Sequence, residues 1–217
     1  MKFELVVFDW DGTLADSTDR IVDSMRTAAE KVGMPTIPDS SIQNIIGLGL
    51  PEALQTLWPA INADQMELMR EAYARNFVSD SPVEMKLFDG ARELLDALLN
   101  AGVKIAVATG KSRKGLDRIL KDLDMTETFH ITRCADETRS KPDPLMLKQI
   151  LTNLDVTAEK AVMIGDTTYD LDMGSSAGMS TLAMSHGAHD EPLLMSRNPL
   201  AILHSITELK HWLFETH

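Results

Sequence analysis

Two aspartates spaced by one residue, Asp9 and Asp11, follow directly on a short apolar run at residues 5–8. Such a run is typical of a buried strand. At the exit from a strand both carboxylates can point into the same space, and Gly12 lets the backbone turn tightly with its N–H close to an anion. Two carboxylates about 4 Å apart repel by roughly 4 kcal/mol at an effective dielectric constant near 20, which favours a cation or a shared proton. The pattern predicts a divalent metal site, with an acidic turn as the alternative.

A second pair of aspartates, Asp166 and Asp170, follows another apolar run at residues 161–164. At the start of a helix this spacing places both carboxylates on one side, one turn apart, where the helix dipole favours negative charge. Together with Asp9 and Asp11 they form an all-oxygen ligand set, which suits Mg²⁺ when waters and phosphate complete it. Because the histidines are scattered and no zinc motif is present, zinc chemistry is not expected.

A carboxylate can itself attack phosphorus, provided that the negative charge of the phosphate is neutralised. Mg²⁺, a lysine and backbone N–H groups would do this. Lys141 is the best candidate for the lysine, because Pro142 and Pro144 fix the local backbone and because it lies between two predicted strands. A solvated surface lysine is the alternative. The basic residues 111–114 either add positive potential near the mouth of the site or form an exposed helix start.

Strands alternate with helices over the second half of the chain, which predicts an α/β fold with a parallel, Rossmann-like sheet covered on both faces. In such a sheet ligands bind outside the carboxyl ends of the strands. Polar side chains end three of the predicted strands at this edge, namely Asp9, Thr109 and Asp166. Their convergence is more informative than any one of them. The predicted strands cover residues 5–8, 103–108, 129–132, 161–164 and 181–184.

Apolar residues recur at helical spacing after the first strand, and glycines and prolines separate the helices. We therefore predict an inserted all-helical cap domain at residues 16–82, and a catalytic core made of residues 1–15 and 83–217. The insertion would face the same edge of the sheet as a lid. For the lid residues Arg20, Gln43, Asn44, Leu48 and Leu50, a contact with the leaving group and a core or solvated role both remain open.

Composition limits the partners. A net charge of −12 in 217 residues argues against nucleic-acid and anionic-membrane binding, because both recruit clustered Lys and Arg. The single cysteine, Cys134, excludes an intrachain disulfide and is expected to be a buried free thiol. No signal peptide or membrane-spanning run is apparent, so the cytoplasm is the expected location. A monomer and a homodimer are both compatible with the sequence.

Four motifs occur in order, at residues 9–14, 109–110, 141–142 and 165–170. They resemble the motifs of the haloacid dehalogenase-like (HAD) hydrolase superfamily, and the resemblance extends over essentially the whole chain. The helical insertion directly after the first motif, with Ile46-Gly47-Leu48-Gly49 inside it, is most similar to the phosphoglycolate phosphatase-like branch.

The resemblance implies that Asp9 attacks phosphorus and becomes an aspartyl phosphate. Asp11 would protonate the leaving alcohol and then deprotonate the hydrolytic water. The side chain of Trp10, where the family often has a smaller residue, is expected to point away from the chemistry. The metal would be held by Asp9, the backbone carbonyl of Asp11, Asp166 and Asp170, the last through water or a hydrogen bond to Lys141. The phosphoryl oxygens would be bound by Gly12, Thr109, Gly110 and Lys141.

The resulting hypothesis is a Mg²⁺-dependent phosphatase acting on a small phosphomonoester metabolite. The acid Asp11 argues against a dehalogenase, because a halide needs no proton whereas an alkoxide does. A phosphomutase of the β-phosphoglucomutase type uses the same two aspartates and stays open. Phosphonate cleavage is a weaker alternative, because Lys31, the lysine within residues 16–82, lies at a helix end. A non-catalytic binding module would be expected to have lost one of these groups, and all are present.

Overall fold

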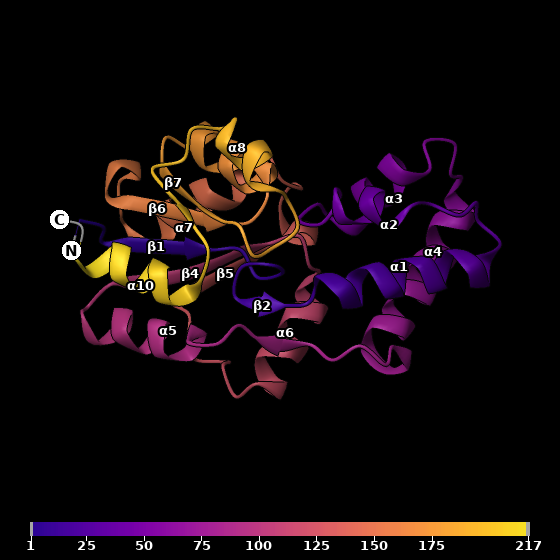
Figure 1. Ribbon diagram of the computed structural model, residues 1–217, viewed down its shortest axis with the longest axis horizontal. Coiled ribbons are helices and arrows are strands. Elements are labelled where there is room, and N and C mark those ends of the chain that lie inside the picture. The colour runs from indigo at the N-terminus through magenta and orange to yellow at the C-terminus, as the bar shows by residue number, and fades with distance from the viewer. Residues whose placement is uncertain (1, 216–217) are drawn as a thin grey trace.

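A six-stranded parallel sheet forms the centre of the fold in the computed structural model, which describes residues 2–215 (Figure 1). The strand order is β5-β4-β1-β6-β7-β8, and every neighbouring pair is parallel. The predicted α/β fold is therefore confirmed. The strands are β1 (Leu5–Phe8), β4 (Lys104–Thr109), β5 (Ile131–Cys134), β6 (Ala161–Gly165), β7 (Ser180–Met184) and β8 (Ile202–Leu203).

Helices cover both faces of the sheet (Figure 1). Alternate residues of β1 point to opposite faces, so Val6 and Phe8 pack with α5, α6 and α10, whereas Leu5 and Val7 pack with α7 and α8. All four side chains are fully buried. The helices of this part of the chain are α5 (Ala91–Asn100), α6 (Arg113–Asp122), α7 (Leu145–Leu154), α8 (Thr168–Ser176), α9 (Glu191–Met195) and α10 (Ile206–Glu215), with short turns η2 (Ala135–Glu137) and η3 (Ala158–Lys160).

Residues 18–80 form a group of helices beside the sheet, which we call the helical segment (Figure 1). It has a core of its own in which Met25, Leu54, Trp58 and Met69 are buried. The segment consists of α1 (Thr18–Val32), α2 (Asp39–Gln43), α3 (Leu50–Leu57), α4 (Ala63–Arg75) and a π-helical turn η1 (Asn76–Asp80).

A two-stranded antiparallel ribbon connects the helical segment to the sheet. β2 (Ala15–Asp16) pairs with β3 (Lys86–Leu87), and the Phe88 N–H donates to the Leu14 carbonyl. The chain thus leaves the sheet and returns to it side by side. The predicted domain limits, 15/16 and 82/83, fall at or near this ribbon and remain a prediction.

Several short elements differ from the expected ones. The strand expected at residues 129–132 is β5 at Ile131–Cys134, because a turn continues to Thr128, whose N–H donates to the Met125 carbonyl. The ribbon strands, β8 and α9 were not predicted. The three strands have only two residues each, which is too short for a periodicity to show. Within residues 2–215 no helix is long and apolar enough to cross a membrane.

Candidate active site

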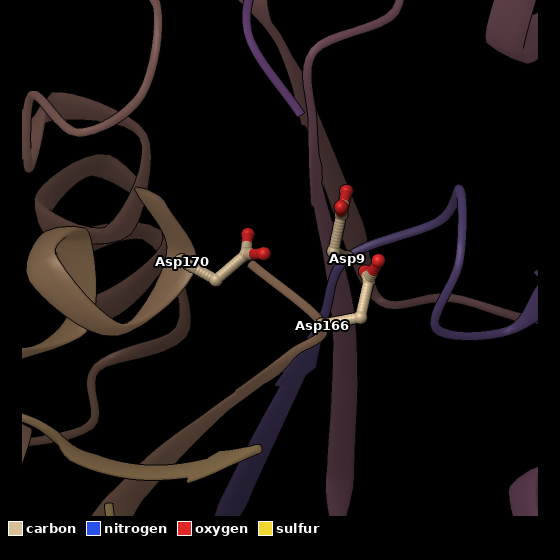
Figure 2. A group of neighbouring side chains, drawn as sticks. All are labelled: Asp9, Asp166 and Asp170. Atoms are coloured by element: carbon tan, nitrogen blue, oxygen red, sulfur yellow. The ribbon is translucent and has the colours of Figure 1, made fainter. Parts of the chain in front are cut away.

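Three carboxylates converge at the carboxyl edge of the sheet (Figure 2). Asp9 directly follows β1 and Asp166 directly follows β6. These two strands are neighbours with Phe8 opposite Ile164, so the carboxylates leave the sheet side by side. Asp170 turns toward them from the first turn of α8, and ligand oxygens of all three lie within 4.8 Å of one another. All three residues are buried.

Lys141 lies between two of these carboxylates. Its ammonium is 2.6 Å from Asp9 Oδ1 and donates to Asp170 Oδ1 at 2.7 Å. The lysine is only 2% exposed, so it is a buried counter-ion and not a solvated surface residue. Apart from this ion pair, neither oxygen of Asp9 has a hydrogen-bond partner in the described part of the chain. A buried, unsatisfied carboxylate oxygen is costly and calls for a ligand.

The other two carboxylates are held rigidly. Asp166 accepts from Thr13 Oγ1 at 2.7 Å and from the Ala188 N–H at 2.8 Å. Gly12, at φ 75°, and Gly187 press so close to it that a Cβ on either would lie 2.1 Å from Asp166 Oδ2. Only glycine fits at these two positions.

Asp170 is fixed by a helix cap. Its Oδ2 accepts from both the backbone N–H and the hydroxyl of Thr167, at 3.1 and 2.7 Å. This capping box begins α8 and aims Oδ1 at Lys141. Of the two contacts that the resemblance allowed for Asp170, the hydrogen bond to Lys141 is present.

The electrostatics of the cluster favour a cation. Burial, together with the charges of Asp170 and Asp166, raises the pKa of Asp9 well above its ordinary value despite Lys141. Burial and the charge of Asp170 raise the pKa of Asp166 to about 7. Burial alone would lower the pKa of Lys141, but Asp170 and Asp9 hold it above its ordinary value. Three carboxylates facing one ammonium therefore fit a hard divalent cation with oxygen ligands.

The carboxylate of Asp11 lies outside this cluster. Its Oδ1 accepts from Ser17 Oγ at 2.5 Å and pairs with Lys111 Nζ at 2.9 Å. A metal contact from Asp11 would have to use its backbone carbonyl, which is the contact that the resemblance implied and which remains a prediction. The sequence left the role of Lys111 open, and the ion pair places its ammonium beside the predicted acid.

Thr109 is the last residue of β4, on the other side of β1 from β6, and Gly110 follows it. Thr109 is buried, and its hydroxyl accepts from the Lys111 N–H at 3.2 Å. The helical segment covers Gly110, because a Cβ there would lie 2.4 Å from the Leu48 carbonyl oxygen and 2.6 Å from that of Gly47. The predicted phosphate-binding residue Gly110 therefore lies beneath the helical segment.

Backbone groups dock the helical segment elsewhere on the same edge. The Asn44 carbonyl accepts from the Tyr169 hydroxyl at 2.9 Å and contacts His189 Nε2 at 3.3 Å. The Gly49 N–H donates to Ser140 Oγ at 2.8 Å. The sequence missed these contacts, because backbone groups are common to all residues and no residue type marks them.

Two further residues singled out in the sequence, Arg20 and Trp10, make structural contacts within the protein. The guanidinium of Arg20 donates to the carbonyls of Phe77 and Val83, at 2.7 and 2.5 Å, which fixes the chain where it leaves the helical segment. Trp10 is fully buried and meets Phe129 edge-on at 6.3 Å between ring centroids. Its indole is part of the hydrophobic core, which agrees with the expectation that it points away from the chemistry.

Comparison with known proteins decides the family. The family model "Haloacid dehalogenase-like hydrolase" matches residues 6–184. The chain belongs to this family. The matched residues include all four motifs that carried the resemblance, at residues 9–14, 109–110, 141–142 and 165–170.

Individual relatives differ in their activities. Phosphoglycolate phosphatase from Rhodospirillum rubrum is 26% identical over 219 residues, 96% of this chain and 90% of the relative. Tyrosine-protein kinase PtkA from Mycobacterium tuberculosis is 29% identical over 205 residues, 94% of this chain and 69% of the relative. A crystal structure of a hydrolase from Pseudomonas syringae superimposes with a TM-score of 0.88 at 23% identity, covering 97% of each chain, and supports the fold. The family and the phosphatase relative agree with the predicted enzyme class, a phosphoric monoester hydrolase of the phosphoglycolate phosphatase-like branch.

Proposed function

We propose that this HAD hydrolase is a Mg²⁺-dependent phosphatase that hydrolyses a small phosphomonoester through an aspartyl phosphate on Asp9. The observation that carries the proposal is the state of Asp9 itself. It is buried beside Asp166 and Asp170, one of its oxygens is paired with Lys141, and it has no other partner among the described residues. Such a carboxylate is placed to receive both a cation and an electrophile.

The cation would be held by Asp9, Asp166 and the backbone carbonyl of Asp11, with Asp170 close by. Mg²⁺ bound there supplies positive charge that offsets the repulsion between a phosphate dianion and the carboxylates. The support for Mg²⁺ is the all-oxygen donor set and its unbalanced negative charge. The rigid cradle of Asp166 between Gly12 and Gly187 adds a fixed ligand position.

The chain's own residues would then perform two transfers. In the first, an Asp9 oxygen forms a bond to phosphorus while the ester P–O bond breaks, and Asp11 gives its proton to the departing alkoxide. In the second, water attacks phosphorus, its proton passes to Asp11, and the bond from Asp9 to phosphorus breaks. Lys141 orients Asp9 from one side throughout.

Phosphoryl oxygens would be bound by Thr109, by the N–H groups of Gly12 and Gly110, and by Lys141. The helical segment acts as a cap in this proposal, because Gly47 and Leu48 cover Gly110. A covered site would exclude bulk water and would admit a small ester and not a macromolecule. The absence of nucleic-acid and membrane partners, a cytoplasmic location, and a monomeric or homodimeric state remain predictions.

Phosphate release from a panel of small phosphomonoesters tests the proposal, with Mg²⁺ and with EDTA. The wild type is compared with Asp9→Asn, which keeps the shape of the side chain and removes its nucleophilicity. We expect release that requires Mg²⁺ and the wild-type aspartate. The ranking of the esters would identify the substrate class.

The same experiment separates hydrolysis from transfer to another hydroxyl. A phosphomutase would rearrange a sugar phosphate with little release of inorganic phosphate. Full activity of Asp9→Asn would refute the covalent mechanism, and equal activity in EDTA would refute the metal requirement.

A further inference from the structure

The two oxygens of Asp11 have different surroundings. Oδ1 accepts from Ser17 Oγ at 2.5 Å and lies 2.9 Å from Lys111 Nζ. The hydrogen bond and the ion pair that the described residues 2–215 make with this carboxylate both go to Oδ1, not to Oδ2. The carboxyl group is thus held by one oxygen, and the other is left for proton exchange.

Lys111 is itself held in place. Its backbone N–H donates to Thr109 Oγ1 and its carbonyl accepts from the Ala135 N–H, both at 3.2 Å. Its ammonium lies 4.5 Å from the centroid of the Phe77 ring, which belongs to η1 of the helical segment, and its side chain is only 10% exposed. The flexible stem is therefore already ordered, and the entropy cost of placing the charge falls on folding and not on catalysis.

The neighbouring cationic side chains of Arg20 and Lys141 have other partners than Asp11. The guanidinium of Arg20 also lies over the Phe77 ring, at 5.4 Å, but it donates to the carbonyls of Phe77 and Val83. Lys141 pairs with Asp9 and Asp170. Among the ion pairs of the described chain, Lys111 alone contacts Asp11. Each of the two predicted catalytic aspartates thus has its own lysine.

We propose that Lys111 is a positioning residue that orients Asp11 for proton transfer to the leaving alcohol. The inference rests on the proposed phosphatase function and extends it to a residue that the family motifs do not include. With Oδ1 held by Lys111 and Ser17, the proton moves from Oδ2 to the ester oxygen as the P–O bond breaks. In the second step Oδ2 takes a proton from the attacking water.

The contact of Lys111 with Phe77 connects the orientation of the Asp11 carboxyl group to the helical segment. The ring stacks on Tyr73 of α4, with 5.8 Å between centroids, and η1 continues α4 directly. Asp11 is therefore oriented by residues of both parts of the chain: Ser17 precedes α1, Lys111 follows β4, and Phe77 steadies the lysine.

The choice of ester distinguishes positioning of the acid from other roles. An alkyl phosphate such as glycerol 2-phosphate releases an alkoxide and depends on the acid, whereas p-nitrophenyl phosphate releases a stable phenolate. General acid catalysis is worth about 10²- to 10⁴-fold, so misplacing the acid should cost part of that factor. For Lys111→Met we expect kcat/KM to fall about 10- to 100-fold with the alkyl ester and less than about threefold with the aryl ester.

Two variants complete the experiment. Lys114→Met, at an exposed lysine in the first turn of α6, three residues after Lys111, is the matched control and should leave kcat/KM for both esters unchanged. Ser17→Ala removes the hydrogen bond from Ser17 to Oδ1 and should likewise lower kcat/KM more for the alkyl ester than for the aryl ester. This variant tests the proposal if Lys111→Met does not fold. Lys111→Arg should recover part of the activity with the alkyl ester.

The outcomes separate the two proposals. Equal losses with both esters, no loss with either, or a rise in KM without a fall in kcat would overturn the role of Lys111 while wild-type activity stands. If the wild type released phosphate no faster than Asp9→Asn, the proposed function would fail, and the role of Lys111 with it.

Discussion

Gly110→Ala tests whether the contact between the helical segment and the sheet is needed for catalysis. Gly110 does not have a positive φ, so alanine suits its backbone. The added Cβ would lie 2.4 Å from the Leu48 carbonyl oxygen and 2.6 Å from that of Gly47. Both are backbone atoms and cannot rotate away, so the helical segment must retreat from the sheet.

The size of that retreat follows from the contact distances. Carbon and oxygen atoms in close contact lie about 3.3–3.6 Å apart, so the Leu48 carbonyl has to move by roughly 1 Å. A displacement of about 1 Å in a residue group that borders the reacting atoms can cost about 10²-fold in rate. We therefore expect kcat/KM for an alkyl phosphate to fall by about two orders of magnitude. The strands and their helices are untouched, so the unfolding temperature should change little.

Steady-state kinetics and thermal unfolding of the same preparations measure both effects. Gly115→Ala is the matched control, because this glycine lies in α6 and its Cβ would meet only the Ser112 hydroxyl, at 3.2 Å. Alanine also favours a helix by up to about 1 kcal/mol over glycine, so the control should be active and at least as stable. Wild-type kinetics in Gly110→Ala would refute the view that the covered arrangement is the catalytic one.

Three further predictions concern buried groups. Replacing Lys141 by methionine leaves Asp9 and Asp170 without their cation, so we expect turnover to be lost. The free energy of unfolding, measured by urea titration at about pH 8, should fall by about 3–5 kcal/mol. An active variant of unchanged stability would contradict the importance of the buried ion pairs. Asp166 has a pKa raised from 3.8 to about 7, so between these pH values the folded metal-free protein holds a proton that the unfolded chain has lost. The free energy of unfolding of the metal-free protein should therefore fall as the pH rises from about 4 to about 7. Mg²⁺ favours the ionised form and should raise the unfolding temperature more at about pH 8 than at about pH 5, whereas equal rises would argue against carboxylate ligation. Burial raises the pKa of the Cys134 thiol to about 12, so iodoacetamide should label it slowly in the native protein and rapidly in urea; fast native labelling would show that the thiol is accessible.

Much of the site could be predicted from the sequence because its residues end strands. Asp9, Thr109 and Asp166 each follow an apolar run, and parallel strands bring such positions to one edge. The structure places Asp9 and Asp166 side by side for this reason, and it places Thr109 on the neighbouring strand. The fold class followed from the same alternation of strands and helices.

The remaining features depend on contacts that residue types do not encode. The helical segment docks through the carbonyls of Asn44, Gly47 and Leu48, and any residue could supply these atoms. Lys111 has a long flexible stem that can reach solvent or the site, so its sequence position alone left both open. In the structure its ammonium is placed by the ion pair with Asp11 and by the ring of Phe77, and both residues lie far from Lys111 in the sequence.

The ribbon of β2 and β3 makes the helical segment an exchangeable module. Ala15 pairs with Leu87 and Asp16 with Lys86, and paired residues of antiparallel strands have Cα atoms only about 4.5–5.5 Å apart. A helical segment from a relative could therefore be grafted between these two strands without stretching the sheet. Evolution could recombine lids and catalytic sheets in the same way, so that the substrate changes while the chemistry at Asp9 is retained.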